Sequence, residues 1–416
     1  MDPLSFLGAC ITGVFLLIVL SYYALLALPR RRRGKPLSFK SITVIMPAHN
    51  EQDHLAMALN AVLDATFHGK KDVIVVDDGS TDMTYKIACA FKAKGVTVLR
   101  TAHKGKSKSI NLALRRAKGQ LVAVVDADSF IAKDALAEAV MLFDAQVGVV
   151  CSTVKVRNKN TFLGAWLQVE QLYNSLLRGL FSKMNVNIVA PGPLSVYRKD
   201  LLKRLGGFEH KGFSEDVDIA VRMIKLGYRV EYAEKAVSET VMPISPKGFW
   251  MQRRRFSRGW ITILKRHLRL NKSFVEIYTL PLALFWYFQA LIMGVITIMN
   301  IAVGYYTYFL SKGIWMNWYV ARFFLEWFSL VGLLRWFWNI ASGMEPLTAF
   351  AAISLMASLL VYPLYVYAIV RFERRITFRD VLVLLFMFPF WFVLMVINVI
   401  SIPEYFSKRQ RNIWEK

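Results

Sequence analysis

Two carboxylates, Asp126 and Asp128, follow directly on the apolar run LVAVV at residues 121–125. A valine-rich run of this length predicts a buried parallel strand. In open α/β sheets ligands bind at the carboxyl ends of the strands, and paired carboxylates there suit a hard divalent cation that also contacts substrate phosphates. Because alternate strand residues face opposite ways, the strand has to end here if both side chains are to reach one ion. The alternative is an acidic turn that only caps a helix beginning at Asp134.

Further acidic residues follow two earlier predicted strands. Glu51 comes shortly after TVIMPA at 43–48, and Asp77 and Asp78 end DVIVVDD at 72–78. Carboxylates from three strand ends in one crevice would repel one another unless a cation or hydrogen-bond donors lay between them. The pattern therefore favours a cation-binding crevice over three unrelated structural turns.

The elements around these residues alternate between strand and helix. We expect further strands at 96–100, 121–128 and 147–154, and helices at 51–64, 82–94, 107–117, 133–144 and 161–181. Helices of this length suit right-handed crossovers, so the pattern predicts a doubly wound, mainly parallel sheet. The turn Pro47-Ala48-His49-Asn50-Glu51 excludes the Gly-x-Gly-x-x-Gly fingerprint of dinucleotide folds.

The loop Gly105-Lys106-Ser107 is similar to the end of a phosphate-binding P-loop, but Arg100 stands where that motif requires glycine. We therefore reject a Walker motif, although Lys106 is still expected to meet phosphates. His49 and His54 lack the spacing of a metal site on one helical face and are interpreted as ordinary polar residues.

Residues 214–218, Ser-Glu-Asp-Val-Asp, fit the start of a helix, with Ser214 as the N-cap and acidic residues in the first turn. A well-capped helix alone would explain this pattern. In combination with the acidic crevice, the segment also offers Asp216 as the base that a metal-using transferase needs.

On a helical wheel, residues 249–268 separate into an apolar arc and a basic arc. The apolar arc holds Phe249, Phe256, Trp260, Ile263 and Leu264, and the basic arc holds Arg254, Arg258, Lys265 and Arg266. This predicts an interfacial helix whose basic face meets lipid headgroups or an anionic ligand. A plain membrane-surface anchor is the alternative.

The composition predicts a membrane protein with a soluble part. Of the 416 residues 55% are hydrophobic, and the mean hydropathy is +0.37. The net charge of +24 would suit nucleic acid, but the lysines and arginines cluster beside apolar spans, as the positive-inside rule expects. We therefore expect no nucleic-acid partner. The three cysteines show no pairing or ligand spacing, which favours a reducing compartment for the soluble part.

Four apolar stretches are long enough to cross a bilayer core of ~30 Å. They cover residues 3–29, 281–310, 345–370 and 381–404. The arginines at 30–33 indicate that the domain after the first span is cytoplasmic, and no cleaved signal peptide is expected. Segment 317–340 contains Arg322, Glu326 and Arg335, so it either crosses or lies in the interface, and the C-terminal crossings number three or four.

Taken in order, four motifs resemble those of the membrane-embedded processive family 2 glycosyltransferases, such as cellulose, chitin, hyaluronan and poly-N-acetylglucosamine synthases. They are Asp77-Asp78-Gly79-Ser80, Asp126-Ala127-Asp128, Ser214-Glu215-Asp216 and Gln252-Arg253-Arg254-Arg255-Phe256. The family usually has Thr in place of Ser214 and Trp in place of Phe256. The nearest likeness is to bacterial poly-β-1,6-N-acetylglucosamine synthases, through LGAWLQVEQLYNSLLRGLF and the ending FPFWFVLMVINVIS.

The resemblance implies roles for the matching donor-side residues. Asp78 would contact the uracil of a UDP-sugar with Glu51 and Asp77 nearby. Asp126 would meet the nucleotide and, with Asp128, a metal ion, either Mg²⁺ or Mn²⁺.

The same resemblance assigns the reaction and the acceptor side. Asp216 would be the general base, and Gln252 and Arg255 would hold the diphosphate. Phe256 and Trp260 would bind the acceptor sugar, although phenylalanine lacks the indole N–H donor.

The resemblance also implies a GT-A-type nucleotide-sugar-binding domain with interfacial helices and α-helical transmembrane spans. The expected divisions are a membrane anchor at 1–35, a glycosyltransferase domain at 36–246, interface helices at 247–280, and a transmembrane region with a basic tail at 281–416.

The expected activity is metal-dependent, inverting hexosyl transfer from a UDP-sugar, with UDP-N-acetylglucosamine as first choice, to a growing β-linked polysaccharide exported through the membrane region. A hyaluronan-, chitin- or cellulose-like synthase and a non-processive enzyme that adds one sugar to a lipid are the alternatives. A transporter would leave the acidic crevice unused. The enzyme is expected to be a multi-pass plasma-membrane protein with the lipid bilayer and a polysaccharide acceptor as partners, and an accessory membrane subunit is left open.

Overall fold

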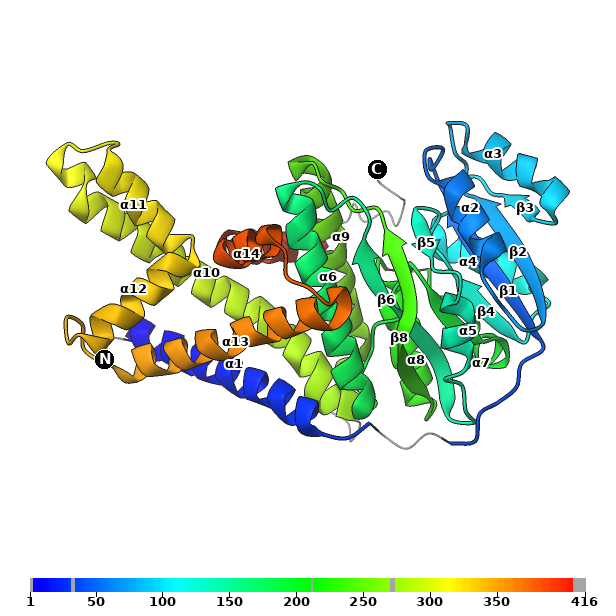
Figure 1. Cartoon of the computed structure of the whole chain (residues 1–416), viewed down its shortest axis with the longest axis horizontal. Helices are drawn as coiled ribbons and strands as arrows, with labels where there is room; N and C mark the ends of the chain where they lie inside the picture. The colour runs from blue at the N-terminus through cyan, green and yellow to red at the C-terminus, as the bar shows by residue number, and fades with distance from the viewer. Residues whose placement is uncertain (1–2, 31–33, 211, 270–273, 407–416) are drawn as a thin grey trace. The chain divides into compact units, whose positions relative to one another are not determined.

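The computed structural model describes residues 3–30, 34–210, 212–269 and 274–406, and its chain divides into two compact units (Figure 1). Among the described residues, one unit takes 3–28, 160–173 and 282–406, and the other takes 29–159 and 174–281. The arginines at 31–33 and the basic residues Lys408, Arg409 and Arg411 lie outside the described residues.

The second unit contains one eight-stranded mixed sheet with the order β3-β2-β1-β4-β7-β6-β8-β5. The strands are β1 (Ser41–Ala48), β2 (Lys70–Asp77), β3 (Thr97–Arg100), β4 (Leu121–Val124), β5 (Ser129–Ile131), β6 (Val147–Val156), β7 (Ser195–Arg198) and β8 (Arg229–Thr240). The pairs among β1, β2, β3 and β4 are parallel, as is β6 with β8, whereas β7 runs antiparallel to both β4 and β6.

Helices follow the strands in the predicted alternation. They are α2 (Leu55–Asp64), α3 (Thr84–Ala90) with a 3₁₀ turn (Phe91–Lys94), α4 (Lys106–Arg116), α5 (Ala135–Val140), α7 (Lys199–Arg204), α8 (Glu215–Lys225) and α9 (Pro246–His267). Helix α6 (Phe162–Lys183) begins in the first unit and ends in the second. The doubly wound, mainly parallel sheet that the sequence predicts is thus confirmed.

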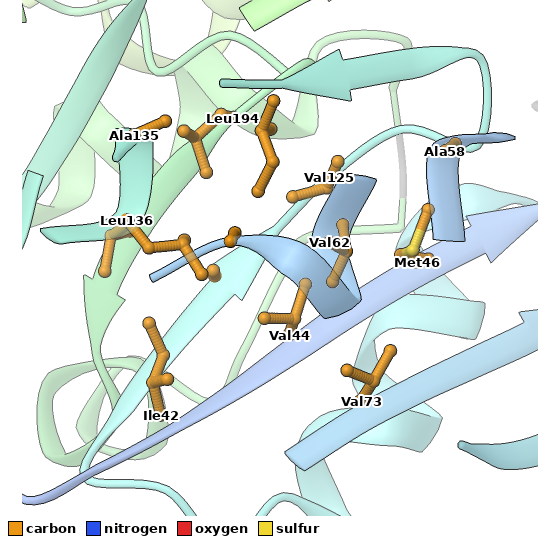
Figure 2. Close-up of a cluster of buried hydrophobic side chains, with 14 of the residues drawn as sticks. Ile42, Val44, Met46, Ala58, Val62, Val73, Val125, Ala135, Leu136 and Leu194 are labelled. Atoms are coloured by element: carbon orange, nitrogen blue, oxygen red, sulfur yellow. The ribbon is translucent and has the colours of Figure 1, made fainter. Parts of the chain in front are cut away.

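The core that supports the carboxyl ends of the strands is built from β-branched and aliphatic side chains of β1, β2 and α2. Val44, Met46 and Val73 pack with Val62 and with Leu194, which precedes β7 (Figure 2). All five side chains are buried, as expected for central strands covered on both faces. This packing fixes where each parallel strand ends and therefore where its first polar residue lies.

The structure corrects the boundary of the strand before Asp126. We expected one strand over 121–128, but β4 ends at Val124, and a turn closed by Ser129 N donating to the carbonyl of Asp126 (3.0 Å) leads into β5. Ending the strand there is the condition under which both carboxylates can approach one ligand.

The apolar helices lie mainly in the first unit. Three described helical stretches are long and apolar enough to span a membrane: Phe6–Ala27 in α1 (Pro3–Ala27), Val275–Lys312 around α10 (Leu280–Tyr308), and Ala351–Glu373 in α13 (Ala349–Glu373). Helices α14 (Phe378–Leu385) and α15 (Met387–Phe406) pass the test only together and meet at a bend of 54°. The described part of the chain thus offers three spans, or four if the bent pair is one.

Segment 317–340 forms two short helices, α11 (Trp318–Trp327) and α12 (Leu330–Ala341). At 1.5 Å per residue each covers only roughly 15–18 Å, about half of a bilayer core. The charged residues of this segment pair with one another: Arg322 Nε lies 2.8 Å from Glu326 Oε1, and Arg335 pairs with the same carboxylate. Neither helix could cross a bilayer alone.

Gly119 provides a test of the sheet register. A Cβ at this position would lie under 3.0 Å from backbone atoms of Thr43, Ile42 and Leu121, which cannot move without shifting β1 against β4. We expect Gly119→Ala to destabilise the second unit by about 2–3 kcal/mol in urea unfolding. The neighbouring exposed Lys118→Ala should change stability by less than about 0.5 kcal/mol. Equal destabilisation by the two substitutions would show that the backbone moves to accommodate the added Cβ at 119.

Candidate functional site

The first acidic group lies at the ends of β1 and β2. These strands are parallel neighbours with Ala48 opposite Asp77, so Glu51, Asp77 and Asp78 follow at one edge of the sheet. All three are buried. Arg100 from β3 neutralises Asp77, with Nε at 3.0 Å from Oδ2, and Thr84 Oγ1 accepts from the backbone N–H of Glu51 at 2.7 Å.

Asp78 orders the loop that precedes α4. Its carboxylate accepts hydrogen bonds from Lys104 N (2.8 Å), from Gly105 N (2.7 Å) and from the Thr101 hydroxyl. Gly105 has a φ of 93°, a left-handed conformation that glycine adopts without strain. The expected contact of Asp78 with a uracil ring stays a prediction, but the structure gives this carboxylate a second role in holding the loop.

Two histidines share the carbonyl oxygen of Asp78. His49 Nδ1 lies 2.9 Å from it and His103 Nδ1 lies 3.2 Å from it, and the centroids of the two rings, which are tilted by 32°, lie 4.1 Å apart. His49 is therefore buried beside Asp78. Its partner is distant in the sequence, so local spacing could not indicate the pair.

A second group of charges gathers Lys106, Asp126 and Glu215 from α4, the turn after β4, and α8. Lys106 Nζ lies 2.5 Å from Asp126 Oδ1 and 3.5 Å from Glu215 Oε1. Burial acts to lower the pKa of Lys106, but Asp126 and Glu215 outweigh it and raise that pKa above its ordinary value. Gly192 lies against this pair, because a Cβ there would be 2.7 Å from Lys106 Nζ. The lysine is therefore a fixed cation in the acidic crevice.

The assignment of Asp126 and Asp128 to a divalent ion stays a prediction. Both side chains are partly exposed, and Asp128 Oδ1 accepts from Ser129 Oγ at 3.1 Å. Within the described residues no three His, Cys, Asp or Glu side chains form a metal-binding group. Mg²⁺ or Mn²⁺ commonly binds one or two carboxylates together with substrate phosphates, which matches this donor set.

Asp216, in the first turn of α8, has a raised pKa. Burial and the neighbouring Glu215 raise its pKa to about 7, although Lys106 and the N–H of Val217 act in the opposite direction. Ser214 occupies the N-cap position of α8, but its side chain makes no capping hydrogen bond, in contrast to our expectation. The reason is a contact with α9. Ser214 Oγ packs against Gly259, in the space that a Cβ on residue 259 would occupy.

Helix α9 carries the remaining predicted residues. Arg255 and Phe256 are exposed, and the Arg255 guanidinium lies 5.6 Å from the Phe256 ring centroid. Gln252 donates to Met242 Sδ at 3.5 Å, and Trp260 is partly buried. The packing of Gly259 on Ser214 brings α9 to the start of α8, but no contact joins Gln252 or Arg255 to Asp216 in the described structure.

The apolar and basic arcs expected on α9 are only partly confirmed. Phe249, Ile263 and Leu264 are buried, whereas Phe256 is 37% exposed and Arg253, on neither arc, is buried. The helix packs its inner face on its own unit, and the exposed side retains basic residues. Contact with lipid headgroups stays a prediction.

A charged cluster that we did not predict from the sequence ties α8 to α9. Asp218 accepts hydrogen bonds from Arg222 Nε (2.7 Å), Arg266 Nη1 (3.0 Å) and His267 Nε2 (2.8 Å). The i,i+4 spacing of Asp218 and Arg222 was a usable signal. The partners on α9 are 48 and 49 residues away and had no such signal.

This cluster predicts a pH-dependent stability. Burial acts to raise the pKa of Asp218, but hydrogen bonds from His267 and Arg266 and the charge of Arg222 lower it to about 2. A lowered folded-state pKa stabilises the protein above the unfolded value of about 3.9, and this contribution of about 2–3 kcal/mol is lost as the pH falls toward 2. Asp218→Asn should lose it at pH 7, and its stability should depend less on pH between 5 and 3.

Asp200→Asn is the matched control for that substitution. Asp200 also pairs with an arginine, Arg198, at 2.6 Å, but its side chain is 60% exposed, so its loss should cost less than about 1 kcal/mol. Urea unfolding of both variants at pH 7 and pH 3 gives the comparison. If Asp218→Asn were no more destabilising than Asp200→Asn, the buried cluster would not hold the two helices together.

Comparisons with known proteins agree with this geometry. Residues 43–206 match the family profile described as Glycosyl transferase family 2. The chain is 28% identical over 229 residues to a probable glycosyltransferase, YdaM, of Bacillus subtilis, covering 52% of this chain and 54% of that protein. It is 27% identical over 233 residues to poly-beta-1,6-N-acetyl-D-glucosamine synthase of Staphylococcus aureus, covering 55% and 56%.

The chain thus spans about half the length of the curated relatives it matches. A solved structure, mannosyltransferase PcManGT from Pyrobaculum calidifontis in complex with GDP-Man and Mn²⁺, has a TM-score of 0.59 at 21% identity and covers 95% of this chain and 99% of that one. That similarity supports the fold. Residues 43–206 thus match the family 2 glycosyltransferase profile, and the mixed sheet has the GT-A fold.

Proposed function

We propose that the chain transfers a sugar from a UDP-sugar, with UDP-N-acetylglucosamine as first choice, to a growing β-linked polysaccharide with inversion at the anomeric carbon. The observation that carries this proposal is the meeting of Lys106, Asp126 and Glu215 next to Asp216 at the carboxyl edge of the sheet. Lys106 and Asp126 suit a diphosphate and a cation, and Asp216 offers a base. The named polysaccharide synthase among the relatives supports the choice of donor.

On the donor side, we assign Glu51, Asp77 and Asp78 to the nucleoside and Lys106 to its phosphates. Asp126 and Asp128 would hold Mg²⁺ or Mn²⁺, which supplies positive charge toward the leaving diphosphate when bound. Arg255 is exposed and always protonated, and we assign it with Gln252 to the same diphosphate. These positive groups favour departure of UDP because they stabilise the charge that develops on it.

On the acceptor side, Asp216 accepts the proton of the attacking hydroxyl. The bond from that oxygen to the anomeric carbon forms as the bond from the anomeric carbon to the diphosphate breaks, and the proton moves to the Asp216 carboxylate. A pKa of about 7 suits this step, because about half of the groups are ionised at pH 7 and the carboxylate is basic enough to take up a proton.

Asp216→Asn should abolish transfer while UDP binding persists, because the change removes the base and leaves the nucleotide side of the crevice intact. In the wild type, the rate should rise as the pH increases through about 7, since the base acts in its ionised form. Initial rates with UDP-N-acetylglucosamine and calorimetric UDP titrations measure the two effects. More than a few per cent of residual turnover would reject the assigned base.

Chain extension and export through the membrane-spanning helices form the finer part of the proposal. We also assign residues 36–246 to a cytoplasmic catalytic domain and 247–280 to interface helices in a multi-pass plasma-membrane protein. Phe256, 37% exposed beside Arg255, and Trp260 offer aromatic faces for an acceptor sugar. Since Phe256 cannot donate the hydrogen bond of an indole, single transfer to a lipid acceptor is the second candidate.

Incubating the detergent-solubilised protein with each UDP-sugar and Mg²⁺ or Mn²⁺, and then sizing the product, separates these candidates. We expect long chains from the wild type, and shorter chains or none from Phe256→Ala with UDP affinity reduced less than about threefold, because the ring acts on the acceptor. Phe274→Ala, another exposed phenylalanine of the same unit, is the control and should leave chain length unchanged. Production of only mono-glycosylated lipid would replace the processive assignment with the lipid-linked one.

A further inference from the structure

The position of Lys106 has a consequence for the order in which ligands bind. Its ammonium lies where three elements meet, 2.5 Å from Asp126 Oδ1 and 3.5 Å from Glu215 Oε1. The side chain of Lys106 and that of Asp126 are each 23% exposed, so solvent screens the pair only partly. Lys106 is the first residue of α4, and the Asp78 carboxylate fixes the loop just before it through Lys104 N and Gly105 N.

The turn around Gly192 closes the other side of this pair. Asp126 N donates to the carbonyl of Gly192 at 3.1 Å, and a Cβ on Gly192 would lie under 3.0 Å from both Asp126 and Lys106 Nζ. The absence of a side chain at 192 therefore lets the ammonium reach the carboxylate. Backbone packing of the loop before α4 and of the turn around Gly192 thus holds Lys106 against Asp126.

Lys106 and a divalent ion would compete for the same carboxylate. Asp126 is one of two residues assigned to the metal, and a second cation on the oxygen that already contacts Lys106 would be repelled. Moreover, the described residues contain no group of three His, Cys, Asp or Glu that could hold a metal by itself. A bound diphosphate removes both obstacles to metal binding. It offers an alternative anionic partner to the lysine, and it supplies oxygen ligands to the metal.

We propose that Lys106 is an internal counter-ion that opposes metal binding at Asp126 until the diphosphate of the donor draws its ammonium away. This inference rests on the proposed function, since it assumes a metal-assisted nucleotide diphosphate site. Lys106 is a positioning residue in this scheme, and it makes metal and nucleotide bind in a strongly coupled manner. The crevice thereby avoids holding a metal without a substrate.

Mn²⁺ binding to the full chain in detergent tests the proposal without requiring turnover. Free Mn²⁺ is measured by electron paramagnetic resonance, with and without UDP, for the wild type, for Lys106→Gln and for Lys108→Gln. Lys108 is exposed on the same helix, so it controls for the loss of one positive charge. We expect Lys106→Gln to bind Mn²⁺ about tenfold or more tightly than the wild type in the absence of UDP, and Lys108→Gln to match the wild type.

The coupling between the two ligands gives a second readout. The factor by which UDP raises Mn²⁺ affinity should be smaller in Lys106→Gln than in the wild type, because the competing cation has already been removed. Should Lys106→Gln fail to keep the circular dichroism and melting temperature of the wild type, Lys106→Met takes its place as an uncharged side chain of similar length.

Mn²⁺ affinity without UDP that is equal in the wild type and the folded Lys106 variant would overturn the counter-ion role. Failure of the proposed function looks different, because the wild type would then bind no Mn²⁺ even in the presence of UDP. Tighter Mn²⁺ binding by Lys108→Gln as well would also overturn the proposal, since the effect would then be one of net charge.

Discussion

The crevice depends on one constraint, the need to compensate several carboxylates buried at a single edge of the sheet. The segment from residue 100 to 106 meets most of this need. Arg100 pairs with Asp77, the N–H groups of Lys104 and Gly105 bind Asp78, and Lys106 pairs with Asp126. One connection between β3 and α4 thus holds acidic residues from the end of β2 and from the turn after β4. A ligand that binds there has to replace some of these contacts, which links nucleotide binding to the order of this loop.

The parallel half of the sheet could be predicted because its strands are continuous apolar runs separated by helices of ordinary length. The antiparallel half was harder to predict from the sequence, because β5 and β7 have only three and four residues and are too short to show an alternating hydrophobic pattern. These strands form by pairing with β4, β6 and β8, which is a tertiary property. The early end of β4 at Val124 is likewise set by tertiary pairing and not by the local sequence.

The same division applies to the site. The acidic residues at the strand ends were found from their position after apolar runs, and the structure brings Asp126 to Lys106 and Glu215. Local patterns could not indicate that burial beside Glu215 raises the pKa of Asp216, because that effect depends on packing around the start of α8. They also missed the contact of His49 with His103 and the partners of Asp218 on α9, in which residues far apart in the chain meet.

The account is tested most directly by locating a metal and a nucleotide together in this crevice. Crystals of the full chain grown with UDP and Mn²⁺, measured at the manganese absorption edge, would show the ion by its anomalous signal. The account predicts one Mn²⁺ between Asp126, Asp128 and the diphosphate, with the uracil beside Glu51, Asp77 and Asp78 and with Lys106 on a phosphate oxygen. Anomalous density away from both Asp126 and Asp128 while UDP is bound, or UDP bound away from the carboxyl edge of β1, β2 and β4, would contradict it.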